Sequence, residues 1–177
     1  WGAPEIEQLI RDIADAAEAP KSMAHRETQK YFLGSLVVYV RDNADSVNHD
    51  AVIYETIDGQ QRHTTLSILL AYLKNVANCA EQDLALLNLN LDFDSRPKSA
   101  RTLHNLFQQV QSDAPEEPSI RAAFTIIERY FKTQAIDIAK FCRHLLKNVT
   151  ILRVAVPQDT DLNHYFEIMN NRGEQLE

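Results

Sequence analysis

The pattern of apolar and polar residues divides the chain into helical and extended segments. Apolar residues recur every three or four positions from Pro4 to Glu18, which predicts an amphipathic helix. Runs rich in β-branched and aromatic residues predict strands over 31–40, 51–57 and 149–156, and Pro157 ends the third of them. The polar link between the first two strands favours their pairing as a hairpin.

A second set of segments has helical periodicity. A strong leucine-rich stripe at 3.6-residue spacing predicts a long helix from Gln60 to about Asn78. Further helices are predicted over 99–111, 119–132, 135–147 and 161–170. Segment 84–93 fits either a helix end or an extended chain. The simplest architecture is therefore a single α+β domain, with a small mixed sheet and several helices inserted between its strands.

Composition places the chain in the globular class. Its 177 residues, 45% of them hydrophobic, suffice for one domain with a real core. No apolar run is long enough to cross a bilayer and the start of the chain has no secretory pattern, so a cytoplasmic location without membrane contact is expected. The residues leave open whether the chain forms a homo-oligomer.

Charge argues against DNA binding by general positive charge, because the formal net charge is -7. The region from Arg121 to Arg153 is nevertheless basic, with seven cations against two acids. Candidate DNA-facing residues are Arg129, Lys132, Lys140, Arg143 and Lys147. A solvated helix face is the favoured alternative for such a charge run.

Missing motifs exclude several common chemistries. Glycine occurs only at positions 2, 34, 59 and 173, so neither the Walker A loop nor the dinucleotide-binding glycine fingerprint is present. The common zinc and serine-hydrolase signatures are also absent. Cys79 and Cys142 are isolated in the sequence and are expected to be reduced and partly buried. Histidines without ligand spacing, expected at the surface or in packing, are His63, His104, His144 and His164.

One dense polar segment, residues 58–65, lies between an apolar strand and the longest predicted helix. Unpaired N–H groups and the positive end of the helix dipole suit a phosphate at such a helix start. Gly59 allows close backbone approach, and the Arg62 guanidinium can bind phosphate oxygens in bidentate fashion. Asp58 can hold a magnesium ion or orient a water. Neutral hydrogen bonds would come from Gln60, Gln61, Thr64 and Thr65.

A purely structural interpretation of this segment is equally supported by the residues. Asp58 as N-cap and Gln61 at the third helical position form a capping-box pattern, worth about 1 kcal/mol without any ligand. Capping does not explain Arg62 followed by two threonines, which are weak helix formers. Local physics therefore leaves a ligand site and a capped helix start evenly balanced.

Two further positions carry structural alternatives. Gly173, after Asn170 and Arg172, reads first as a helix C-cap. Gly34, inside the first strand and beside Ser35, suggests a bulge or a close approach by backbone or ligand.

Taken together, these segments resemble the GmrS-type N-terminal domain, which has a ParB/sulfiredoxin-like fold and occurs in GmrSD-type modification-dependent (type IV) restriction enzymes and related phage-defence proteins. The resemblance rests on Tyr31–Ser35, on Ile57–Arg62 continuing into Leu66, and on Phe166–Leu176, and it spans nearly the whole chain. It implies an NTP-hydrolysing regulatory domain that senses modified DNA and is coupled to an HNH-type nuclease domain. A non-catalytic binding module for nucleotide or DNA is the alternative.

The resemblance also implies roles for individual residues. Asp58, Gln61 and Arg62 would be catalytic, Asp58 also holding Mg²⁺ or another divalent cation beside the NTP. Nucleotide-binding residues would be Gly34, Ser35, Gly59, Gln60, Arg62, Thr64, Thr65, Asn170 and Arg172.

The sequence departs from the family pattern in three ways. His63 stands where the family usually has an aliphatic residue, a harmless change if that side chain faces solvent. A Tyr-Gln-Arg segment normally precedes a tryptophan like Trp1, so the chain is expected to begin inside the domain. The HNH-type nuclease domain that usually follows does not occur before Glu177, so no DNA cleavage by this chain alone is expected.

Overall fold

The computed structural model describes most of the chain in two compact units. The described residues are 1–19, 30–41, 52–77, 79, 81–111, 114–157 and 160–161. The unit called here the helical unit comprises Trp1–Phe32 and Gln61–Thr150, and the sheet unit comprises Leu33–Gln60 and Ile151–Glu177.

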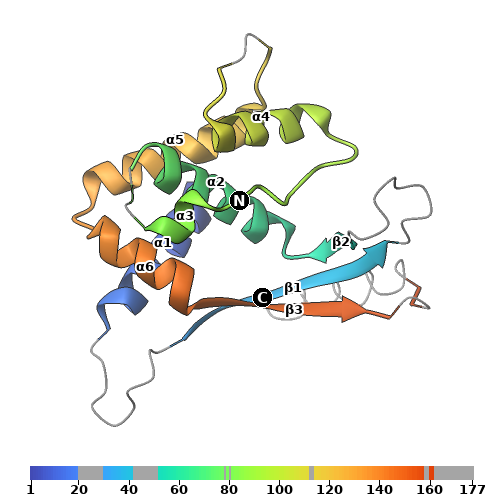
Figure 1. The fold of residues 1–177 in the computed structure, drawn as a ribbon, viewed down its shortest axis with the longest axis horizontal. Helices are drawn as coiled ribbons and strands as arrows, with labels where there is room; N and C mark the ends of the chain where they lie inside the picture. Colours follow the sequence, from blue (N-terminus) through green and yellow to red (C-terminus); the bar gives the residue numbers. More distant parts are fainter. Residues whose placement is uncertain are drawn as a thin grey trace. The chain divides into compact units, whose positions relative to one another are not determined.

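Three strands form one sheet of order β2-β1-β3 (Figure 1). Their bounds are Tyr31–Arg41 for β1, Ile53–Asp58 for β2 and Val149–Val156 for β3. β1 and β2 are antiparallel, with a register shift between Val37 and Val38, whereas the β1 and β3 arrows point the same way (Figure 1). The sheet is therefore mixed, and the helices α2 to α6 form the long connection that a parallel β1–β3 pair requires.

A small apolar cluster holds the sheet unit together. Val37, Ile57 and Val156 are 4–7% exposed and come from all three strands, and Tyr39 packs against them. Earlier in β3, the Leu152 side chain is 59% exposed. Strand residues alternate between two faces, so a shift by one residue would move the cluster residues out of the core. The cluster therefore fixes the strand register, in which Asp58 at the end of β2 lies opposite Val37.

Six helices are present among the described residues. Their bounds are Ala3–Glu18 for α1, Gln60–Asn75 for α2, Gln82–Ala85 for α3, Pro97–Gln108 for α4, Pro118–Thr133 for α5 and Ile138–Asn148 for α6. Proline starts α4 and α5, where a missing N–H costs nothing. At the start of α6 the Asp137 carboxylate accepts a hydrogen bond from the Lys140 backbone N–H at 3.0 Å.

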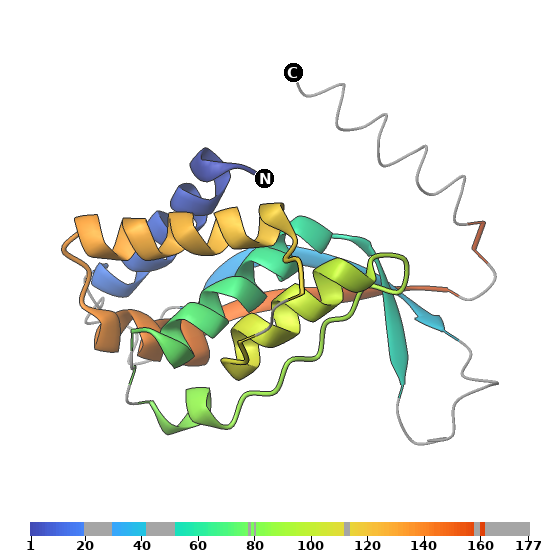
Figure 2. The same cartoon turned by 90° about the horizontal axis from the view of Figure 1, so that it is seen from above.

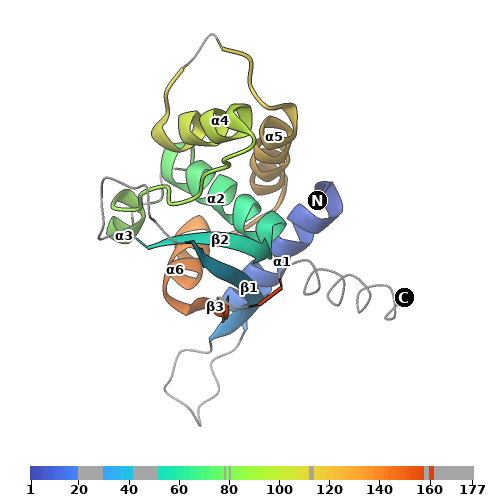
Figure 3. The ribbon, with the colours of Figure 1, turned by 90° about the vertical axis from the view of Figure 1, so that its right-hand side faces the viewer.

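Helix α2 lies among the other helices of the helical unit (Figures 2 and 3). Its buried residues include Thr65–Leu69 and Ala71–Leu73. Because such consecutive residues point to all sides of a helix, α2 is covered on nearly every side between 65 and 73. The Tyr72 ring contacts Phe131 of α5 with centroids 5.3 Å apart, and the Asn75 amide donates to the Leu106 carbonyl of α4 at 2.8 Å. The helix expected over this segment is therefore confirmed, and it is central and buried nearly all round.

The α+β class is confirmed, and most expected elements appear with ends shifted by a few residues. The ambiguous segment 84–93 contains the end of the short α3 and then irregular chain. The helix expected over 161–170 lies outside the described residues, apart from Asp161.

Candidate phosphate site

The turn from β2 into α2 contains the residues Asp58–Gly59–Gln60. β2 ends at Asp58, Gly59 has a φ of 86°, and α2 begins at Gln60. A positive φ is strained for any residue with a Cβ, so glycine is the residue that lets a strand pass directly into a helix here. The free backbone N–H groups at the start of α2 therefore begin at Gln60, directly after Gly59.

Gly59 is also required by a close approach within the sheet unit. A Cβ at this position would lie 2.9 Å from the Ser35 carbonyl oxygen and 3.2 Å from Leu36 Cδ1. Gly34, the residue before Ser35, has a φ of 116°. The structure thus brings Ser35 and Leu36 of β1 close to Gly59, and both Gly34 and Gly59 have a positive φ, although the register shift of β1 lies between Val37 and Val38.

Asp58 is exposed, and among the described residues its carboxylate has no hydrogen-bond or ion-pair partner. Since α2 begins at Gln60, the N-cap position is Gly59 and the third helical residue is Arg62. The capping box of Asp58 with Gln61 is therefore not formed. The interpretation of Asp58 as a helix N-cap therefore loses its main support.

The two glutamines differ in their surroundings. The Gln60 side-chain amide donates to the Thr56 carbonyl at 2.8 Å, so it folds back onto β2. Gln61 is exposed at the first turn of α2. Gln61 is consequently the more available of the two for a ligand or a water.

Arg62 is partly exposed and has an interaction partner in the structure. Within the helical unit it lies near Tyr31. Burial and the hydrogen-bonded Asp12 carboxylate raise the pKa of Tyr31, and the Arg62 charge opposes them. A guanidinium carries five N–H donors in a planar fork, the geometry that suits phosphate oxygens.

The next residues of α2 point in different directions. Thr65 is 4% exposed and belongs to the core, whereas Thr64 is partly exposed. His63 is not on an open surface, because its Nδ1 is buried without a hydrogen-bond partner and burial lowers the pKa of its imidazole. The His63 side chain thus does not face open solvent, the condition under which its departure from an aliphatic residue was expected to be harmless.

Two predicted nucleotide-binding residues, Asn170 and Arg172, lie outside the described residues.

The basic stretch on α5 and α6 is largely neutralised within the helical unit. Arg129 pairs with Glu7 at 3.0 Å, and Lys140 pairs with Glu18. The remaining pairs are Lys132 with Glu128 and Arg143 with Glu81. Lys147 is exposed and, within the part of the chain that the structure describes, has no carboxylate partner. Four of the five candidate DNA-facing cations thus have a structural role that needs no DNA.

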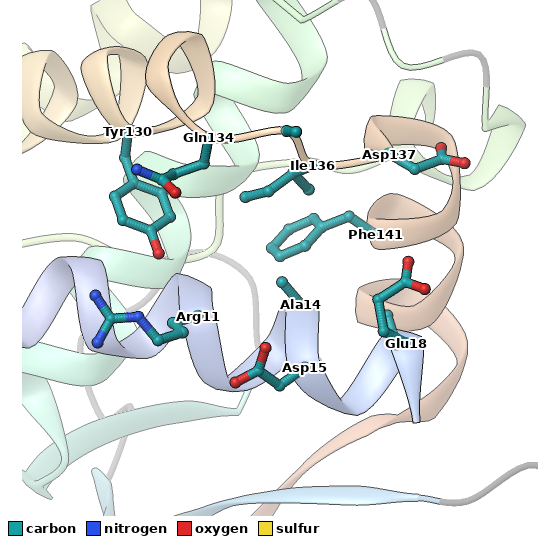
Figure 4. A pocket seen from close by; sticks show the side chains of 11 residues that line it. Arg11, Ala14, Asp15, Glu18, Tyr130, Gln134, Ile136, Asp137 and Phe141 are labelled. Carbon is teal, nitrogen blue, oxygen red and sulfur yellow. The ribbon is translucent and has the colours of Figure 1, made fainter. Parts of the chain in front are cut away.

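A cavity of about 280 Å³ lies between α1, the end of α5 and the start of α6 (Figure 4). Ala14, Ile136 and Phe141 form its apolar part, and its carboxylates come from Asp15, Glu18 and Asp137. The sequence did not indicate this hollow, because its residues come from two stretches, 11–18 and 130–141, that are more than 100 positions apart in the chain. Its single guanidinium, from Arg11, hydrogen-bonds to Tyr130. With three carboxylates against one cation the cavity does not suit a phosphate, and we assign the candidate site to the helix start instead.

The fold and this turn define an α+β domain with a glycine-dependent strand-to-helix turn, of the kind that presents backbone N–H groups and an arginine at a helix start. The family model described as GmrSD restriction endonuclease, N-terminal domain, matches residues 1–177. The chain therefore belongs to this family of restriction endonuclease domains, a class of proteins that acts on DNA. Among curated proteins no sequence matches the chain. No helix in the described part of the chain combines the length and the apolar composition needed to span a membrane.

Proposed function

We propose that the chain binds a nucleoside triphosphate with a divalent cation at residues 58–65 and hydrolyses it. In this proposal it is a regulatory domain that couples nucleotide turnover and sensing of modified DNA to a separate HNH-type nuclease domain. The observation that carries the proposal is the exposed Asp58 carboxylate, which has no partner in the described part of the chain and lies in the turn into α2 of a GmrSD N-terminal domain.

The local chemistry supports a phosphate at the start of α2. The first N–H groups of a helix lack intrahelical acceptors and lie at the positive end of its dipole. Gly59, directly before them, allows the backbone to turn into the helix with a φ of 86°. Arg62, in the first turn, would add a permanent positive charge for the phosphate oxygens.

The residues present also fit a divalent cation held mainly by the nucleotide. Among the described residues no group of three or more His, Cys, Asp or Glu side chains could hold a metal alone. Magnesium in nucleotide sites usually takes one or two carboxylates together with phosphate oxygens and waters, and Asp58 offers one such carboxylate. The bound cation would supply neutralisation of phosphate charge. Asp58 would hold it, and Gln61 would orient the attacking water.

The experiment that tests the proposal measures phosphate release from NTP by the full-length protein that contains this domain, with and without modified DNA. Wild type is expected to release phosphate, and Asp58→Asn and Arg62→Gln are expected to lose release while retaining their circular dichroism spectra. Normal release by both variants would contradict the proposal. Calorimetric NTP binding without release, even with modified DNA, would favour a non-catalytic binding module.

A further inference from the structure

Two cysteines that are distant in the sequence meet inside the helical unit. Cys142, on α6, lies beside Cys79, which follows the end of α2. An ion pair beside them joins the same two segments, because Arg143 Nε lies 3.2 Å from Glu81 Oε1. The contact between the segments is thus seen in two adjacent pairs of side chains.

The two thiols differ in access to solvent. Cys142 is 1% exposed, whereas Cys79 is partly exposed. Burial raises the pKa of the Cys142 thiol, and the neighbouring Cys79 raises it further, so Cys142 stays protonated. A soluble oxidant therefore reaches Cys79 first.

A metal does not explain the pair, since the described residues contain no group of three or more metal-ligating side chains around it. Both cysteines are free. What remains is the chemistry of two adjacent thiols, one accessible and one protected.

We propose that Cys79 and Cys142 are a redox modification site, which a peroxide converts into a disulfide linking the segment after α2 to α6. The Cys79 thiolate attacks one peroxide oxygen, the O–O bond breaks, and hydroxide leaves, giving a sulfenic acid. The Cys142 sulfur then attacks the Cys79 sulfur, the S–O bond breaks, and water leaves with the thiol proton. Two thiols lose two electrons and two protons in total, and one peroxide becomes two waters.

The test treats the folded protein with hydrogen peroxide, then unfolds it in N-ethylmaleimide and measures the intact mass. The expected product is about 2 Da lighter than the reduced protein, takes up no maleimide, and takes up two after treatment with dithiothreitol. Two free thiols after peroxide, or a sulfinic or sulfonic acid at Cys79 with Cys142 still free, would overturn the proposal.

Single variants test the order in which the two thiols react. Cys142→Ser should accumulate a sulfenic acid at Cys79 that dimedone traps, and Cys79→Ser should resist the same peroxide dose because its remaining thiol is buried. Cys142→Ala replaces Cys142→Ser if a buried hydroxyl prevents folding. Equal oxidation of Cys142 in wild type and in Cys79→Ser would contradict the assigned order of reaction.

Discussion

Two charged regions of the molecule differ in how many of their charges have a partner. On α5 and α6 the density of cations is high, but five of them, including Arg121 with Glu116, already lie against carboxylates of the same unit. At the turn before α2 charges are few, yet the exposed Asp58 has no partner in the described chain. The number of charges in a segment therefore says less about ligands than the number whose electrostatic partners are missing.

The strongest test of this contrast is Asp58→Asn compared with Asp92→Asn. Both aspartates are exposed, but Asp92 accepts a hydrogen bond from the Phe93 N–H at 2.7 Å and lies outside the α2 turn. We expect Asp58→Asn to lower NTP hydrolysis by about 100-fold or more, the scale for losing a group that positions cation or water. Asp92→Asn should leave the rate within about twofold of wild type. Phosphate release and thermal melting measure the two effects, and equal losses in both variants would remove the distinction.

The turn itself is tested by Gly59→Ala. A Cβ there meets the Ser35 carbonyl oxygen at 2.9 Å on backbone with a φ of 86°, so we expect a loss of about 1–3 kcal/mol in the free energy of unfolding. Gly2→Ala is the matched control, since its nearest atom would be 3.6 Å away and its backbone is ordinary. Denaturant titration should show a small change for Gly2→Ala. A cost for Gly59→Ala no larger than that of the control would mean that the turn relaxes freely.

Two histidines allow a test of where the nucleotide binds, because His63 belongs to the candidate segment and His144 to α6. Each has one ring nitrogen buried without a partner, and burial lowers the pKa of each. Negative charge near an imidazole favours its protonated form. We therefore expect a bound NTP to raise the pKa of His63 and to leave that of His144 unchanged. Titration of both rings by NMR measures this, and a shift at His144 alone would place the nucleotide elsewhere.

The smallest effects are expected for the paired cations. We expect Arg143→Ala to change DNA affinity less than about twofold and stability by about 0–1 kcal/mol, because its partner is the Glu81 carboxylate. Lys147→Ala is the informative comparison, since Lys147 has no such partner in the described chain. Fluorescence anisotropy with modified DNA measures both. An equally large loss in both variants would mean that DNA displaces the internal ion pairs.

Most of the fold could be predicted from the sequence because local periodicity is strong where elements have one buried side. β3 was predicted at its observed bounds, 149–156, since β-branched residues precede Pro157. The helix α2 was also predicted, but its burial on nearly all sides was not, because leucine spacing does not show how many sides of a helix are covered.

The candidate site was predictable only in part. Asp58 and Gly59 were indicated by their residue types between strand and helix, and the structure adds that Gly59 rather than Asp58 occupies the N-cap position. Thr65 could not be assigned from the sequence, because threonine is as common in a core as at a site, and here it is 4% exposed. The contact of Cys79 with Cys142 is tertiary, and no spacing in the sequence encodes it.

The ion pairs of the helical unit bear on how the proposed DNA binding should be measured. Added salt screens Arg129–Glu7, Lys140–Glu18 and Arg143–Glu81, all of which join separate segments of the chain. A plot of binding constant against salt concentration therefore contains a contribution from loosening of the protein beside the release of counterions from DNA. The slope counts phosphate contacts only after the same salt series has been followed on the free protein.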